Sequence, residues 1–403
     1  MSLAEVARRA LDDIRARGTH RKMRRLEGPQ ASRMRVDGRD VLLFAGSNYL
    51  DLASHPAVVE AAARAARDFG CAAGGSRLIS GNLSLHEELE ERLAAFVGCP
   101  AALVFSTGYM ANLGVIPALV GDGDVLVSDA LNHASIVDGA RLSRARVRVF
   151  PHGDVSALEA VLAEERGRSR HILIAVDGVY SMDGDVAPLR EIASAARASG
   201  ALLAVDDAHG TGTLGANGRG SLEHLGLEPG GASGVDVVVG TLGKSLGSFG
   251  AFVAGSLALR DLLVNTARSF IFSCALSPPQ VAAALAALEL IEKQPSRRWL
   301  LQQRAAQLRS RLAEAGISTA PSTTHIVPVI IGDNLETMQI CHELLARGFY
   351  AQGIRHPSVP PGTARLRITP MASHTEHDID RLANTLIELL GARWTESARA
   401  ASG

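Results

Sequence analysis

The sequence lacks the compositional features of several protein classes. Lys plus Arg number 41 and Asp plus Glu number 42, and the net charge of −1 gives no excess of positive charge for binding nucleic acid. No run of apolar residues is long enough to cross a bilayer, so no membrane partner is expected. The first 18 residues mix acidic, basic and apolar positions, which is typical of an amphipathic helix and not of a targeting peptide.

Cysteine is also scarce, and the four that are present are far apart. They are Cys71, Cys99, Cys274 and Cys341, with no CxxC pair among them. This spacing indicates neither a disulfide framework nor a metal site built on cysteine. We therefore expect reduced thiols, a cytoplasmic protein and no bound metal.

Glycine is abundant, with 40 residues that gather in short clusters after apolar runs. Between about residues 100 and 255 these runs alternate with helical patterns, and several are continuously apolar, as in strands covered on both faces. The predicted strands are 102–106, 124–129, 146–150, 171–179, 201–207, 235–241 and 250–255. The pattern predicts an α/β fold with a seven-stranded, mostly parallel sheet.

The pattern changes at both ends of this region. Before it, "SLHEELEERLAAFVG" predicts a helix that begins with a capping box of Ser84 and Glu87 and ends at Gly98. After about residue 290, long helical stretches alternate with a few strands, which indicates a smaller α+β domain. The expected segments are an N-terminal helical and extended part (1–48), a large domain (49–290) and a small C-terminal domain (291–403).

Side chains that can carry chemistry follow five of the predicted strands. Because ligands gather at the carboxyl ends of strands in an open parallel sheet, we expect these residues along one edge. They are Gly108 and Tyr109 in "STGYMAN", His133, Ser181, Asp206 and His209, and Thr241 and Lys244. An amine, a carboxylate, imidazoles, hydroxyls and a glycine turn suit pyridoxal phosphate (PLP), which has an aldehyde, a ring nitrogen, a phenolic oxygen and a phosphate. A metal held by Asp206, Asp207 and His209 is the alternative, but no second His or Cys stands at ligand spacing.

Longer stretches of the sequence resemble one known family. "DDAHGTGTLGANGRG" followed by "TLGKSLGSFGAFVAG" is similar to the α-oxoamine synthases, PLP enzymes of fold type I. The resemblance runs from about residue 40 to 390 and includes "GGSRLISGNLSLHEELE", "FSTGYMANLG" and "YSMDGDVAPL". The stretch "GIRHPSVPPGTARLRITPMASHT" resembles the branch of the family that acts in biotin synthesis, whereas "FSTGYMANLG" also resembles the serine palmitoyltransferases.

The resemblance implies a role for each residue of the predicted edge. Lys244 would bond to the aldehyde of PLP and later remove the α-proton of the substrate. Asp206 would pair with the ring nitrogen, and His209 would bind the phenolic oxygen. His133 would stack on the ring, and Ser181 would lie in the same hydrogen-bonding layer as His209. The backbone N–H groups of Gly108 and Tyr109 and the hydroxyl of Thr241 would approach the phosphate.

The resemblance also implies substrate-binding residues and a homodimer. Arg367 would bind the carboxylate of the amino acid, and Arg21, His133 and Ser358 would contact substrate. In the family the phosphate is also reached from the neighbouring subunit, by a segment in which this sequence has Cys274 in place of the usual threonine. Asp51 likewise stands where the family usually has glycine.

The activity that the resemblance implies is a decarboxylative condensation. L-alanine and a pimeloyl thioester, carried on coenzyme A or a carrier protein, would give 8-amino-7-oxononanoate and carbon dioxide. Another α-oxoamine synthase with serine palmitoyltransferase-like or other acyl specificity is an alternative, as is an aminotransferase or aldolase. A non-catalytic partner subunit is disfavoured, because Lys244, Asp206, His209 and His133 are all present.

Overall fold

The chain folds into two compact units that are not consecutive in sequence. The computed structural model describes residues 1–230 and 234–401. The larger unit, called the sheet unit, contains Ser47–Ser181 and Asp185–Leu300. The smaller, called the terminal unit, contains Met1–Gly46, Met182–Gly184 and Leu301–Gly403. The N-terminal segment thus joins the C-terminal residues in one unit, a grouping that the sequence pattern does not indicate.

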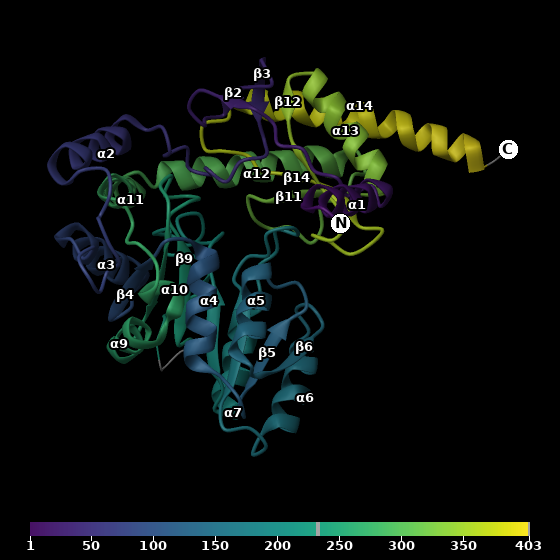
Figure 1. Cartoon of the computed structure of the whole chain (residues 1–403). Helices are drawn as coiled ribbons and strands as arrows, with labels where there is room; N and C mark the ends of the chain where they lie inside the picture. The colour runs from purple at the N-terminus through teal and green to yellow at the C-terminus, as the bar shows by residue number, and fades with distance from the viewer. Residues whose placement is uncertain (231–233, 402–403) are drawn as a thin grey trace. The chain divides into compact units, whose positions relative to one another are not determined.

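A seven-stranded sheet forms the centre of the sheet unit (Figure 1). Its order is β4 (Ala101–Phe105), β10 (Ala251–Gly255), β9 (Val237–Thr241), β8 (Leu202–Asp206), β7 (Ile172–Asp177), β5 (Val125–Asp129) and β6 (Arg146–Phe150). Only β10 is antiparallel to its neighbours, so the other six strands run in one direction. All residues of β4, β5, β7, β9 and β10 are buried, because apolar side chains point to both faces. The predicted α/β fold with a mostly parallel seven-stranded sheet is confirmed.

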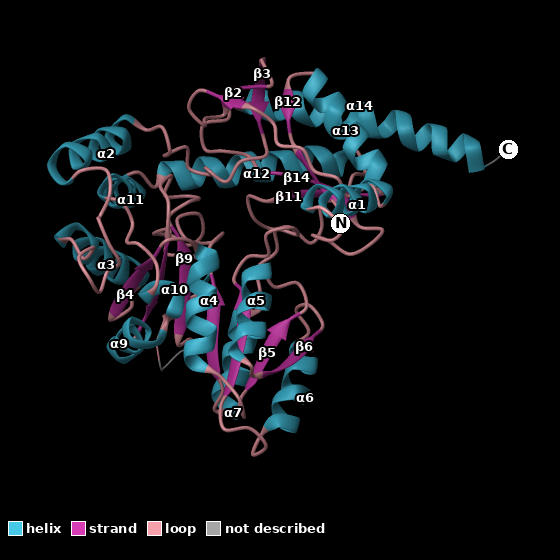
Figure 2. Ribbon diagram, viewed as in Figure 1, coloured by secondary structure: helices cyan, strands magenta, loops and turns pink. Residues whose placement is uncertain are grey.

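Between β4 and β9 helices alternate with strands along the chain, and the other helices of the sheet unit precede β4 or follow β10 (Figure 2). The helices of this unit are α2 (Pro56–Phe69), α3 (Ser84–Val97), α4 (Gly108–Leu119), α5 (Ala134–Ser143), α6 (Val155–Glu165), α7 (Leu189–Ser199), α8 (Ser221–His224), α9 (Leu257–Thr266), α10 (Arg268–Ile271) and α11 (Pro278–Lys293). One core cluster joins Val115 of α4, Ile136 of α5 and Leu263 of α9 to Leu126 and Val239 of the sheet. This packing holds α4 and α5, which begin at the carboxyl ends of β4 and β5, against the sheet.

The start of α3 differs from the prediction. The residue that caps the helix is Leu83, whose backbone N–H donates to Nδ1 of the fully buried His86 at 3.2 Å. The expected capping box of Ser84 and Glu87 is wrong, because Ser84 is already helical and Glu87 accepts from the side chain of Asn82 at 2.8 Å. Gly98 ends the helix in the left-handed conformation, with φ 79°, as predicted.

The terminal unit contains two small sheets and four helices or parts of helices. A four-stranded sheet has the order β1 (Leu26–Glu27), β2 (Arg33–Val36), β3 (Arg39–Leu43) and β12 (Phe349–Tyr350). An antiparallel sheet has the order β11 (Val327–Gly332), β14 (Ala364–Ile368) and β13 (Gln352–Ile354). The helices are α1 (Leu3–Ala16), α13 (Asn334–Ala346), α14 (Glu376–Ala401) and most of α12 (Ser296–Glu314).

The short segment Met182–Gly184 is held within the terminal unit by side chains of that unit. Arg365 of β14 donates to the carboxylate of Asp183 and, at 3.3 Å, to the carbonyl oxygen of Met182. The hydroxyl of Thr324 donates to the carbonyl oxygen of Gly184 at 2.8 Å. Gly184 has φ 72°, and a Cβ atom there would lie 2.0 Å from a backbone carbonyl oxygen, so only glycine fits.

Within the part of the chain that the structure describes, none of the helices combines the length and the apolar character needed to cross a membrane.

Candidate active site

The predicted residues of the sheet unit lie where five parallel strands end. Strands β4, β5, β7, β8 and β9 point the same way, so the segments after them start at the same edge. Gly108 and Tyr109 begin α4 after β4, His133 caps α5 after β5, and Ser181 follows β7. Asp206 and Thr241 are the last residues of β8 and β9, and His209 and Lys244 each follow by three residues. The topology therefore brings the predicted set to one edge.

Lys244 belongs to a hydrogen-bonded series that also contains Tyr49. Its Nζ lies 2.9 Å from Nε2 of His209, and Nδ1 of His209 lies 2.8 Å from the hydroxyl of Tyr49. Tyr49 is fully buried and His209 is 8% exposed. The sequence predicts Lys244 and His209 but not Tyr49, because 160 residues separate Tyr49 from His209 and no local pattern links them.

The carboxylate of Asp206 is fixed by Asn112, a second residue that the sequence does not reveal. Nδ2 of Asn112 donates to Oδ2 of Asp206 at 2.6 Å and to the hydroxyl of Ser135 at 2.9 Å. The backbone N–H of Ala208 donates to the other oxygen of Asp206 at 3.1 Å. Asn112 is itself buried and lies near the start of α4, so the helix holds the carboxylate in one orientation.

His133 is a neutral imidazole held by the start of α5. The backbone N–H of Ser135 donates to Nδ1 of His133 at 3.2 Å, so the proton of the neutral ring lies on Nε2. The pKa of His133 lies below its ordinary value, and burial is the main cause. The negative charge of Asp206 opposes this shift, and the positive charge of Lys244 adds to it. A neutral ring is suited to stack on an aromatic cofactor.

A second carboxyl group, Asp177, stands beside Asp206 on the neighbouring strand. The two residues are opposite each other in the pairing of β7 with β8. Burial, and next the negative charge of Asp206, raise the pKa of Asp177, which therefore keeps its proton to higher pH. Its Oδ2 accepts from the backbone N–H of His133 at 2.7 Å. Asp177 thus orients the turn of His133.

The start of α4 offers backbone donors for an anion. Thr107 caps the helix, and its hydroxyl accepts from the backbone N–H of Met110 at 3.1 Å. Gly108 and Tyr109 are the first two residues, and N–H groups at these positions have no carbonyl partner within a helix. The hydroxyl of Thr241 accepts from the N–H of Gly243 at 3.2 Å, which shapes the turn toward Lys244. Such a helix terminus suits a phosphate group.

Comparison with known proteins identifies the family of this chain. Residues 39–386 match the family "Aminotransferase class I and II". The 8-amino-7-oxononanoate synthase of Geobacter sulfurreducens is 52% identical over 373 residues, which cover 92% of this chain and 94% of that protein. The chain belongs to the α-oxoamine synthase family.

Solved structures of α-oxoamine synthases share the fold. A serine palmitoyltransferase variant from S. paucimobilis, solved with PLP and myriocin bound, is 33% identical with a TM-score of 0.89 over 97% of both chains. The 8-amino-7-oxononanoate synthase of Francisella tularensis is 25% identical with a TM-score of 0.76, covering 88% of this chain and 99% of that one. The cofactor of the family is PLP, and the edge residues fit it. They supply a buried carboxylate, an amine in contact with an imidazole, and a helix terminus at Gly108.

The other predicted residues of this α-oxoamine synthase lie in the terminal unit. Nη2 of Arg21 donates to the hydroxyl of Ser358 at 3.3 Å, so two predicted substrate residues are in contact. Arg367 is buried in β14, opposite Gln352 of β13 and Pro328 of β11.

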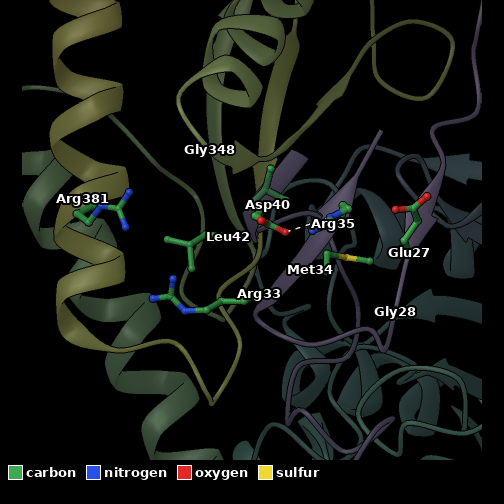
Figure 3. Close-up of a pocket in the computed structure, with 10 residues that line it drawn as sticks. Glu27, Gly28, Arg33, Met34, Arg35, Asp40, Leu42, Gly348 and Arg381 are labelled. Atoms are coloured by element: carbon green, nitrogen blue, oxygen red, sulfur yellow. Dashed lines mark hydrogen bonds and ion pairs between the residues drawn. The ribbon is translucent and has the colours of Figure 1, made fainter. Parts of the chain in front are cut away.

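A separate pocket of about 620 Å³ also lies in the terminal unit (Figure 3). Figure 3 shows Arg33 and Arg381 on two sides of Leu42, and Arg35 directed at Asp40. Arg35 and Asp40 form an ion pair at 3.3 Å, and Arg33 pairs at 2.6 Å with a buried aspartate of α14. No predicted site residue lines this pocket, so it is separate from the predicted site.

Proposed function

We propose that this protein condenses L-alanine with a pimeloyl thioester to give 8-amino-7-oxononanoate, carbon dioxide and the free thiol carrier. One observation carries the choice of substrate within the family. Identity reaches 52% with an 8-amino-7-oxononanoate synthase over almost the whole chain, against 33% with a serine palmitoyltransferase. The proposed place of this reaction is biotin synthesis in the cytoplasm.

Lys244 and its neighbours would handle the proton of the α-carbon. When bound, PLP supplies an electron sink for the electron pair of the broken C–H bond. The amine of Lys244 takes up the α-proton, which requires that the amine be unprotonated at that moment. His209, 2.9 Å from the amine, orients it and would also bind the phenolic oxygen of the cofactor. Asp206, locked by Asn112, would hold the ring nitrogen in its protonated form.

The remaining edge residues would fix the cofactor in place. His133 would stack on the ring, and its Nε2 proton is directed by the hydrogen bond that Nδ1 accepts from Ser135. Ser181 would lie in the same hydrogen-bonding layer. The backbone N–H groups of Gly108 and Tyr109 would bind the phosphate at the start of α4, with Thr241 beside them.

Three further predicted residues would contact the substrates, and a second subunit would complete the site. Arg367 would pair with the carboxylate of alanine, and the bonded pair of Arg21 and Ser358 would contact the acyl substrate. A homodimer is proposed in which the segment of Cys274 approaches the phosphate of the partner's cofactor. The thiol of Cys274 is free and exposed, which is compatible with that placement.

The test of the cofactor site uses the scarcity of lysine. The chain has only three lysines, Lys22, Lys244 and Lys293. Reduction of the PLP-loaded protein with borohydride, followed by peptide mass mapping, should place the cofactor on Lys244 alone. Lys244→Ala should lose turnover while remaining folded, and Lys293→Ala, at an exposed site paired with Glu289, is the matched control. Retained turnover in Lys244→Ala would contradict the proposal.

The test of the substrates measures release of carbon dioxide. L-alanine, L-serine and glycine are each supplied with pimeloyl-CoA or palmitoyl-CoA. The proposal expects carbon dioxide only with L-alanine and pimeloyl-CoA. Release with L-serine and palmitoyl-CoA would keep the family and overturn the substrate, and transfer of an amino group without carbon dioxide would indicate an aminotransferase.

A further inference from the structure

The turn that carries Tyr49 packs directly against the turn that carries Lys244. Oδ1 of Asn48 accepts from the N–H of Ala53 at 3.1 Å, which closes the first turn. The N–H of Gly247 donates to the carbonyl oxygen of Lys244 at 2.9 Å, which closes the second. A Cβ atom at Gly247 would lie 2.4 Å from the backbone nitrogen of Ala53, so the two backbones touch. The hydroxyl of Tyr49 is thereby set in place relative to the amine.

We propose that Tyr49 is a positioning residue for the proton transfers of Lys244, and that it acts through the two tautomers of His209. The inference rests on the proposed function, because it takes Lys244 as the base of the reaction. A tyrosine hydroxyl both donates and accepts, so it can bond to Nδ1 whether or not that nitrogen carries the proton. Phenylalanine would keep the ring and lose this property.

The two protonation states of Lys244 need different tautomers of His209. An ammonium group is a donor only, so Nε2 must accept from it and Nδ1 carries the proton, which it donates to Tyr49. A neutral amine accepts from the N–H at Nε2, and Nδ1 then accepts from the hydroxyl of Tyr49. The imidazole remains neutral with one proton in both states, and the charge changes on Lys244 alone. Tyr49 therefore keeps both states hydrogen-bonded at a buried position.

Removing the hydroxyl should favour one of the two states. In Tyr49→Phe, Nδ1 of His209 lacks this hydrogen bond in a site where His209 is 8% exposed. A buried N–H without its acceptor is the more costly arrangement, so the proton moves to Nε2. Nε2 then no longer accepts from the ammonium of Lys244, and Lys244 should lose its proton at a pH lower by about 0.5–1 unit.

The experiment measures capture of PLP by the apoprotein as a function of pH. The rate follows the fraction of Lys244 that is unprotonated, so its midpoint reports the amine directly. Tyr180→Phe is the matched control, because it removes the hydroxyl of a tyrosine that is 1% exposed in the same unit. His209→Asn and the double variant with Tyr49→Phe form a double-mutant cycle, in which the shift should vanish without His209. The kcat of Tyr49→Phe should fall several-fold, with KM for L-alanine nearly unchanged.

The other titratable groups near Lys244 stay the same in every variant of the cycle. They are the side chains of His133, Asp177, Asp206 and Asp207, which interact with Lys244 through its charge or with one another. A shift seen only in Tyr49→Phe with His209 present therefore belongs to the proposed series. Should Tyr49→Phe not fold, 3-fluorotyrosine at this position keeps the ring and makes the hydroxyl a stronger donor, which should move the midpoint in the same direction.

Each outcome separates this inference from the proposed function. If the wild-type apoprotein captures no PLP, or if Lys244→Ala captures it equally well, the proposed function fails. If the wild type captures PLP and Tyr49→Phe shows the same pH profile, only the role of Tyr49 is overturned. That role is also overturned if Tyr180→Phe moves the midpoint as much, or if the shift persists without His209, because the effect is then structural.

Discussion

Replacing His152 by alanine should remove a stabilising ion-pair cluster whose contribution depends on pH. Nδ1 and Nε2 of His152 each lie 3.0 Å from a carboxylate oxygen, of Asp129 and of Asp185 respectively. These hydrogen bonds raise the pKa of His152 from 6.5 to about 10. The bond to Asp129 makes the largest contribution, and the bond to Asp185 makes the next largest. The cluster stabilises the base of the loop after β7, where Val179 pairs with Val186. Ser181 lies in this loop, between the two paired residues.

The size of the effect follows from the difference between the folded and unfolded pKa. From 6.5 to about 10 is about 3.5 pH units, which at 1.36 kcal/mol per unit sets an upper limit of about 5 kcal/mol. The side chain of His152 is 27% exposed and that of Asp185 17%, so solvent screening reduces the expected contribution to about 2–3 kcal/mol. A raised histidine pKa stabilises fully below pH 6.5, and this stabilisation is lost as the pH rises toward 10.

The assay is urea unfolding of the apoprotein at one protein concentration and at about pH 6, 8 and 9.5. The wild type should exceed His152→Ala by about 2–3 kcal/mol at the lowest pH, and the gap should shrink steadily toward the highest. His171→Ala, at an exposed histidine next to β7, is the control and should show no such trend. A gap that is equal at all three pH values would refute the reasoning, since it would show that lost packing and not charge is responsible.

Three further substitutions test the site and the backbone. Asn112→Leu removes the 2.6 Å hydrogen bond to Asp206 and should weaken PLP binding about 10-fold or more, measured by equilibrium dialysis. Asp51 has φ 55°, so Asp51→Ala should lower the unfolding free energy by about 1 kcal/mol while Asp51→Gly is nearly neutral in urea unfolding. Gly184→Ala should lower the melting temperature far more than Gly362→Ala, because both have positive φ but only Gly184 lacks room for a Cβ atom; equal losses would contradict this.

The sequence predicts the sheet well because its strands are continuous apolar runs. The predicted 146–150 coincides with β6, and the predicted 171–179 contains β7. Parallel strands end at one edge by geometry, which is why Lys244 and His209 could be placed near each other from the sequence and lie 2.9 Å apart. Their catalytic roles stay a prediction until the variants are measured.

The features that the sequence prediction lacks are of two kinds. Some depend on contacts between residues far apart in sequence, and one is a hairpin whose turn residues can be recognised in the sequence. Tyr49 and Asn112 enter the site through tertiary contacts. Each lies close in sequence to a residue singled out above, Asp51 and Gly108, but no local pattern indicates their partners His209 and Asp206. The hairpin of β2 and β3 could have been predicted, because Asp37-Gly38 is a typical two-residue turn and both residues have positive φ. The capping box failed because the helix begins one residue earlier than predicted, and His86 accepts from the backbone N–H of Leu83 in the role expected of Glu87.

The division of the chain into units has a consequence for any attempt to take the protein apart. The backbone passes between units at 46/47, 181/182, 184/185 and 300/301, so no single cut yields either unit as one continuous fragment. A fragment of residues 47–300 would carry 182–184 without Arg365 and Thr324, the side chains that bond to it. We expect such a fragment to expose unpaired backbone carbonyls in the loop of Ser181, and to recover order there when residues 301–403 are supplied as a second chain.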